Sequence, residues 1–150
     1  AWLEVSGPEG LVEEAKARLD IIADAFLPFS DILAAHLPGF LEKIPSQLEE
    51  TRGRCADNHA TLQDLVGEDP ASPVTVMAPQ GGWNVLVRFP SHIDEDELVE
   101  KLLNDYGIYC QPGYFFDVPF AGTISLSLLL EPDSFRENTA KVLRTITALI

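Results

Sequence analysis

Apolar side chains in the first part of the chain recur with the period of a helix. Between residues 9 and 27 they lie three or four positions apart, which predicts an amphipathic helix that Pro28 interrupts. The positions are Leu11, Ala15, Leu19, Ile22 and Phe26. Residues 1–7, which precede this helix, predict a short strand ending in a Ser-Gly-Pro turn.

The next stretch predicts a short helical piece and then a longer helix. Residues 29–40 are rich in apolar side chains, and the short piece is expected to end at Pro38 and the following glycine. A helix is predicted from about residue 41 to residue 66, with Pro45 in its first turns, where a missing N–H costs least. Gly67 ends it.

The second half of the chain changes to shorter segments rich in β-branched residues. The predicted strands are residues 74–77, 83–89, 108–110 and 123–130. The first two flank a glycine turn and form a hairpin. Helices are predicted over 95–106, with Asp94 as N-cap and Gly107 as the stop, and from Ser134 to the end. The expected fold class is α+β, with a small, mostly antiparallel sheet covered by helices. Its core has the order β-β-α-β-β-α and follows the long helices.

Composition narrows the function classes. The chain has 150 residues, 24 acidic and 10 basic, and a net charge of −14. The basic residues are scattered singly, which argues against a nucleic-acid interface. No apolar run is long enough to span a membrane, and residues 1–5 do not have the basic composition of a signal peptide's first region. The two cysteines, Cys55 and Cys110, are far apart and outside any motif, so we expect reduced thiols in a cytoplasmic protein.

Candidate chemistry in the chain is sparse. The three histidines are dispersed and lack metal-ligand spacing. The acidic run 94–97 sits where a helix begins, and acids there offset the helix dipole. Ser125, Ser127 and Cys110 have no base nearby in sequence. All four lysines fall within amphipathic helices, namely Lys16, Lys43, Lys101 and Lys141. We therefore predict no complete catalytic site and no metal site.

Several stretches, in order, resemble the class I/II aminotransferases, which are fold-type I enzymes that use pyridoxal phosphate (PLP). Residues 79–87, PQGGWNVLV, resemble the family's Pro-x-Gly-Gly-aromatic hairpin. Residues 98–116 match a leucine-rich helix followed by Gly-Ile and Pro-Gly-x-x-Phe, and 124–129 resemble the last strand before a closing helix. In the first half, the turn at 5–8, the helix at 18–27 and the Arg-x-x-x-Asn pattern from Arg54 to Asn58 are similar to segments of the same family.

The resemblance implies transfer of an amino group between an amino acid and a 2-keto acid, with PLP held by a lysine outside this chain. It implies that residues 1–40 form a linker strand and helix from a large domain, and that 41–150 form the C-terminal small domain, inactive alone. The complete protein would be a homodimer. The implied substrate-mouth residues are Gly81, Gly82, Trp83, Pro112, Gly113, Tyr114, Phe115 and Ser125.

One departure affects the substrate. Many members of the family have Arg-Leu-Ser in the last strand, where the arginine binds the substrate carboxylate, but Ser125 stands at that position here. Three alternatives remain open. They are a PLP-dependent lyase or synthase of the same fold, a free-standing small-molecule-binding or regulatory domain, and an interaction module that uses the apolar stretch from Phe26 to Phe40.

Overall fold

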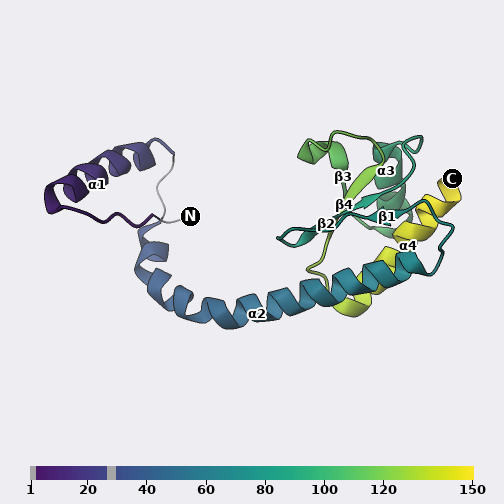
Figure 1. Cartoon of the computed structure of the whole chain (residues 1–150), viewed down its shortest axis with the longest axis horizontal. Coiled ribbons are helices and arrows are strands. Elements are labelled where there is room, and N and C mark those ends of the chain that lie inside the picture. The colour runs from purple at the N-terminus through teal and green to yellow at the C-terminus, as the bar shows by residue number, and fades with distance from the viewer. Residues whose placement is uncertain (1–2, 27–29) are drawn as a thin grey trace. The chain divides into compact units, whose positions relative to one another are not determined.

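The structure is a computed structural model that describes residues 3–26 and 30–150 (Figure 1). The chain divides into two compact units, Ala1–Pro45 and Ser46–Ile150. The α+β class predicted from the sequence is confirmed by four α-helices and a four-stranded antiparallel sheet in the described part. Within the described residues, no helix has both the length and the apolar composition needed to cross a bilayer.

The first unit contains helix α1, Glu9–Asp24, and the beginning of helix α2, Asp31–Gly67. The strand predicted for residues 1–7 is not formed by residues 3–7, and residues 1 and 2 lie outside the described part. The segment has the side chains of a strand but no neighbouring strand among the described residues, and a strand needs a hydrogen-bonded partner.

The predicted end of a helix near Pro38 is wrong. The structure has a single 37-residue helix in which both Pro38 and Pro45 are interior positions, so Pro45 does not lie in a first turn. A proline removes one N–H and crowds the carbonyl four residues earlier, but it can be carried as a kink when the flanking residues continue the helix. The neighbouring Pro28 and Phe29 lie outside the described residues.

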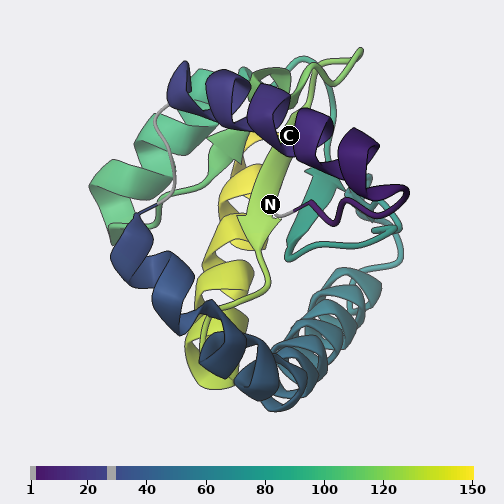
Figure 2. The same ribbon diagram turned by 90° about the vertical axis from the view of Figure 1, so that its left-hand side faces the viewer.

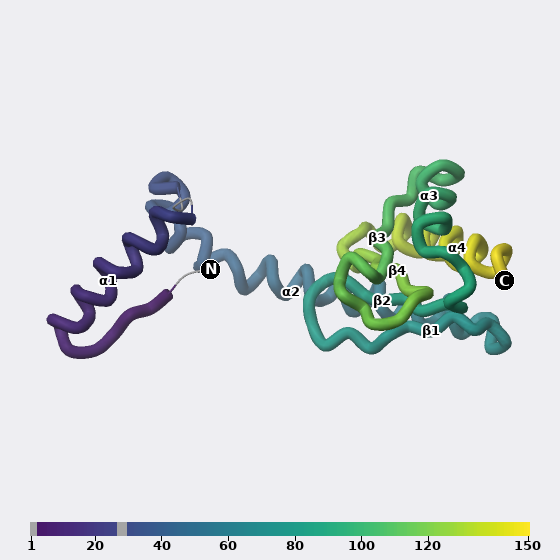
Figure 3. The backbone as a smooth tube through the Cα atoms, turned by 90° about the horizontal axis from the view of Figure 1, so that it is seen from above, coloured from purple at the N-terminus to yellow at the C-terminus, as the bar shows by residue number. Residues whose placement is uncertain are grey.

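The second unit is built on strands β1, Thr75–Val76; β2, Asn84–Arg88; β3, Gln111–Pro112; and β4, Thr123–Ser127. Their order is β1-β2-β4-β3, and every pairing is antiparallel. The predicted hairpin is present as β1–β2. Residues 108–110 were expected to be a strand, but β3 begins at Gln111, and β4 ends at Ser127 rather than at residue 130. The path of the chain through β2, β3 and β4 can be followed in Figure 3.

Local signals set the ends of helix α3, Glu95–Tyr106. The Asp94 side chain accepts hydrogen bonds from the backbone N–H groups of Asp96 and Glu97, both at 3.0 Å, which confirms the predicted N-cap. Gly107 adopts a left-handed conformation with φ of 67° and stops the helix. Helix α4, Pro132–Leu149, begins before the predicted Ser134, because proline suits the first helical position.

The core lies between one face of the sheet and the helices. Val85 and Val87 of β2 pair with Leu126 and Ile124 of β4, and all four side chains are buried. They belong to one apolar cluster with residues of α2, α3 and α4, and Figure 2 shows α4 behind β4. Alternate residues such as Leu86 point to the opposite side. We call that side the free face of the sheet.

Helix α2 holds the segment after β4 by its backbone. Asn58 is fully buried, and its side-chain amide donates to the carbonyls of Leu128 and Leu130 at 3.0 and 2.8 Å. One turn earlier, Arg54 forms ion pairs with Glu50 and Glu131. The Arg-x-x-x-Asn pattern therefore fastens α2 to the connection between β4 and α4.

Replacing Asn58 with alanine should destabilise the second unit, because one buried and one partly buried carbonyl would lose their donor. We expect the free energy of unfolding to fall by about 1–3 kcal/mol in urea titrations. The exposed neighbour Asp57 provides the matched control, and Asp57→Ala should change stability by less than about 0.5 kcal/mol. Equal effects of the two substitutions would contradict the role of Asn58.

Candidate functional site

The first group of predicted site residues forms the tip of the β1–β2 hairpin. Gly81, Gly82 and Trp83 are exposed, and Gly82 has a φ of 77°, which favours glycine. The Trp83 carbonyl accepts a hydrogen bond from the N–H of Leu128 at 2.7 Å. This bond ties the tip to the Ser127 end of β4 and leaves the glycine backbone open to solvent.

The second group lies on the 3-10 turn η1, Gly113–Phe116, and on Pro112 before it. Pro112 and Gly113 are buried, and a β-carbon at Gly113 would come within 2.7 Å of the Thr123 β-carbon. Glycine is therefore required for the turn to pack on β4. Tyr114 and Phe115 are 53% and 56% exposed, with ring centroids 5.0 Å apart in an edge-to-face arrangement.

The structure does not bring the two groups together. The hairpin tip joins β4 at Ser127 and Leu128, whereas η1 packs at Thr123, the other end of the same strand. Ser125 lies between them, with Leu86 and Gln111 as its cross-strand neighbours, and is only 5% exposed. The predicted residues therefore lie along the length of β4 rather than lining one pocket.

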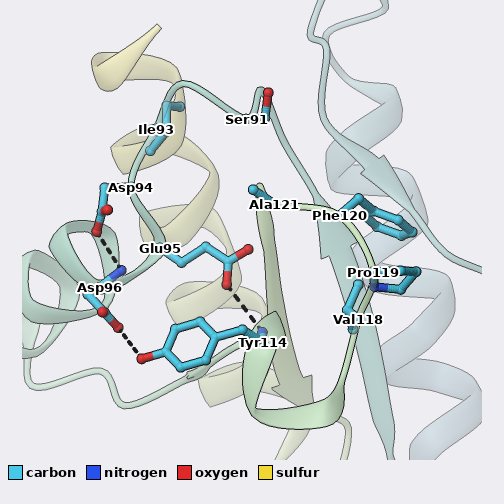
Figure 4. A pocket seen from close by; sticks show the side chains of 10 residues that line it. All are labelled: Ser91, Ile93, Asp94, Glu95, Asp96, Tyr114, Val118, Pro119, Phe120 and Ala121. Atoms are coloured by element: carbon cyan, nitrogen blue, oxygen red, sulfur yellow. Dashed lines mark hydrogen bonds between the residues drawn. The ribbon is translucent and has the colours of Figure 1, made fainter.

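A cavity of about 490 Å³ opens beside η1 and includes only one predicted site residue, Tyr114 (Figure 4). The N-terminus of α3 forms its polar wall, with Asp94, Glu95 and Asp96. The loop 118–121 forms its apolar wall. In Figure 4 the Glu95 and Asp96 carboxylates are directed toward Tyr114 of η1, whereas the Asp94 carboxylate is directed toward the backbone N–H of Asp96.

Glu95 is the functional side chain of this region that the sequence analysis missed. It is 8% exposed, and its carboxylate accepts hydrogen bonds from the N–H of Thr123 at 2.8 Å and of Tyr114 at 3.4 Å. The sequence pattern indicated only its place in a helix's first turn, where acids offset the helix dipole. Its partners lie 28 and 19 positions away, and no local pattern signals such contacts.

Asp96 fixes the exposed end of the same turn. The Tyr114 hydroxyl donates to the Asp96 carboxylate at 2.8 Å. That hydrogen bond, followed by burial and the nearby negative charges, raises the pKa of Tyr114 above its usual value. The hydroxyl is thus held in its protonated, donating form. Each acid from 94 to 96 has a structural partner, so the cavity wall presents no free acid–base pair.

The lysines do not form a cradle for PLP. Lys16 pairs with Glu13, Lys101 with Asp105 and Lys141 with Glu137, in each case along one helix surface, and Lys43 is an exposed residue of α2. No group of three or more His, Cys, Asp or Glu side chains in the described residues could hold a metal ion. The residues of this chain therefore do not fit a covalently held cofactor.

The apolar stretch expected to serve as an interaction surface is exposed where it is described. Phe26 is 79% exposed, Ile32 74% and Phe40 51%, whereas Leu37 is half-buried. Leu27, Pro28 and Phe29 lie outside the described residues. Large apolar side chains exposed in series are typical of surfaces that another part of a protein covers.

Comparisons with known proteins converge on one family. A family model described as aminotransferase class I and II matches residues 12–141. The α-aminoadipate aminotransferase LysN of Thermus thermophilus is 21% identical with a TM-score of 0.65, over 97% of this chain and 37% of that chain. The kynurenine aminotransferase of Pyrococcus horikoshii is also 21% identical, with a TM-score of 0.67, over 95% of this chain and 35% of that chain.

A multiple substrate aminotransferase from Thermococcus profundus is 23% identical, with a TM-score of 0.58, over 74% of this chain and 27% of that chain. At these identities the likeness establishes a shared fold. The chain spans between 27% and 37% of the length of these three enzymes.

Removing the Glu95 carboxylate should loosen the η1 turn. Glu95→Ala leaves the buried N–H of Thr123 without its acceptor, so we expect a loss of about 1–3 kcal/mol in the free energy of unfolding. Amide hydrogen exchange at Thr123 and Tyr114 should accelerate most. Glu97→Ala, at an exposed position of the same helix turn, serves as the control. Unchanged exchange at Thr123 in the Glu95 variant would contradict the assignment.

Cys110 should be unreactive. Burial raises the pKa of its thiol to about 11, so at pH 8 only ~0.1% is thiolate, the form that reacts. Iodoacetamide labelling followed by peptide mass mapping should modify the half-buried Cys55 before Cys110. The Cys110 rate should rise roughly tenfold per pH unit up to about pH 10 as the thiolate fraction grows. Labelling of Cys110 as fast as in the urea-unfolded chain would contradict this.

Proposed function

The chain belongs to the aminotransferase class I and II family, and on that premise we propose that it is the C-terminal small domain of a longer PLP-dependent aminotransferase. The complete enzyme would move an amino group from an amino acid to a 2-keto acid. The observation that carries the proposal is the family match over residues 12–141, in a chain that spans between 27% and 37% of the three enzymes compared above.

The positions of the four lysines support a cofactor-binding lysine elsewhere in the polypeptide. PLP supplies the electron-accepting ring for amino-group transfer, and the enzyme must provide a lysine to hold it. In this chain three of the four lysines are engaged with carboxylates on helix surfaces, and the fourth is exposed on α2. The proposal therefore places the cofactor lysine in another part of the polypeptide and gives this chain no covalent role.

The free face of the sheet and the two turns beside it would form this chain's contribution to the substrate mouth. At the hairpin tip, Gly81 and Gly82 have open space where a side chain would be, which allows a ligand to approach the backbone closely. At the other end, Glu95 and Asp96 hold the aromatic turn at Tyr114 in one position. A turn held in this way can cover a ligand without first becoming ordered.

The proposed partners are the remaining domain of the same polypeptide and a second subunit. The exposed apolar residues of the first unit, such as Phe26, Ile32 and Phe40, support a covered surface there. A lyase or synthase of the same fold would make the same use of these surfaces. The family match favours amino-group transfer over both that alternative and a free-standing regulatory domain.

The test compares this chain with the complete open reading frame that contains it. With one equivalent of PLP, the chain alone should show no visible absorbance band of lysine-bound cofactor and no amino-group transfer. The complete protein should show the band and should convert amino acid and keto acid pairs, detected by mass spectrometry.

Two outcomes would overturn the proposal. One is a cofactor band from the chain alone that disappears when Lys16, Lys43, Lys101 or Lys141 is replaced. The other is a complete protein that binds PLP but releases a deaminated or condensed product from the amino acid without passing its amino group to any keto acid.

A further inference from the structure

The free face of the sheet carries one charge. Arg88, near the end of β2, is the charged side chain on this face. The other strand residues that face the same side are neutral, as Thr75, Leu86 and Ser125 illustrate. The protein has 24 acidic side chains, but none belongs to a strand on this face. Arg88 therefore stands among groups that cannot neutralise it.

The Phe120 ring contacts the Arg88 guanidinium without neutralising its charge. The guanidinium carbon lies 4.6 Å from the centre of the Phe120 ring, which is within the distance of a cation–π contact. Among the described residues, no carboxylate lies within ion-pair distance of Arg88. By contrast, Arg18 pairs with Glu14 and Arg54 with Glu131.

A cavity of about 320 Å³ lies beside this guanidinium. Two hydroxyl side chains, Thr75 and Ser91, line it with Arg88, and Pro73, Pro90 and Ala121 supply apolar walls. Thr75 is the direct cross-strand partner of Arg88 in the β1–β2 ladder, so the ladder fixes both side chains on the same face. One cation, two hydroxyls and apolar walls form a set suited to a small carboxylate.

We propose that Arg88 binds the carboxylate of the amino-acid and keto-acid substrates. The inference rests on the proposed function, since every substrate of that reaction carries a carboxylate. Ser125 is uncharged and 5% exposed, and a hydroxyl cannot replace a bidentate charge pair. Ser125 pairs with Leu86 of β2, and Arg88 follows Leu86 by two residues, which is about 7 Å along the strand. A guanidinium can act from there on the same face.

The experiment uses the complete enzyme in four forms: wild type, Arg88→Gln, Arg88→Lys and Arg136→Gln. The control, Arg136, is exposed on α4 and lies outside the site. Two measurements are made on each form. The first is kcat and KM for an α-amino acid and for the matching amine that lacks the carboxylate. The second is the affinity for propanoate by calorimetry, which needs no turnover.

We expect Arg88→Gln to raise KM for the amino acid about 10- to 100-fold and to weaken propanoate binding by a similar factor, the loss expected for one charge-assisted pair. The kcat/KM for the amine should change less than about threefold, because that substrate makes no such pair. Arg88→Lys should retain part of the affinity, since lysine keeps the charge without the planar fork. Arg136→Gln should match the wild type.

The outcomes separate this inference from the function it rests on. Wild-type values of KM and propanoate affinity in both Arg88 variants would overturn the role of Arg88, while leaving the aminotransferase intact. A complete protein without amino-group transfer would overturn the proposed function, and the propanoate titration would still decide whether Arg88 binds a carboxylate. Equal losses with the amino acid and the amine in Arg88→Lys, whose charge is conserved, would indicate a structural role and also count against the proposal.

Discussion

Glu95 places a carboxylate in the interior of the second unit, where a charge is costly unless donors replace its lost hydration. Those donors are backbone N–H groups of β4 and of the η1 turn, so one side chain joins three elements. The same turn is pressed against β4 at Gly113, where no β-carbon fits. The position of the aromatic turn thus follows from a buried charge and a missing side chain, and the cavity beside it takes its shape from both.

Sequence reasoning succeeded where the deciding forces act within a few residues. Asp94 caps α3 and Gly107 ends it because a side-chain acceptor and a left-handed backbone are local requirements. It failed at other places. Pro38 was expected to end a helix, yet α2 continues through it. The strand predicted before Gln111 depended on a ladder whose register only the folded sheet determines.

The candidate site shows the same division. The hairpin tip and the Pro-Gly turn were found from their glycines, because turns leave a local mark in sequence. No local sequence pattern shows that these two turns lie at opposite ends of β4. No local pattern shows that Arg88 has no carboxylate partner among the described residues either. In sequence Arg88 is one of ten scattered basic residues. Only the β2–β4 register shows that it shares a neutral face with Ser125.

Asn58 and Glu95 both bond to backbone groups rather than to side chains. A peptide carbonyl is present whatever residue carries it, and an N–H is present in every residue except proline. The segment after β4 and the start of β4 can therefore change their side chains without losing these fastenings, whereas a side-chain pair would require two matched substitutions. The two anchoring side chains differ in this respect from the segments that they hold. Replacing Asn58 or Glu95 removes the hydrogen bonds, whereas most substitutions in the bound segments leave the backbone partners in place.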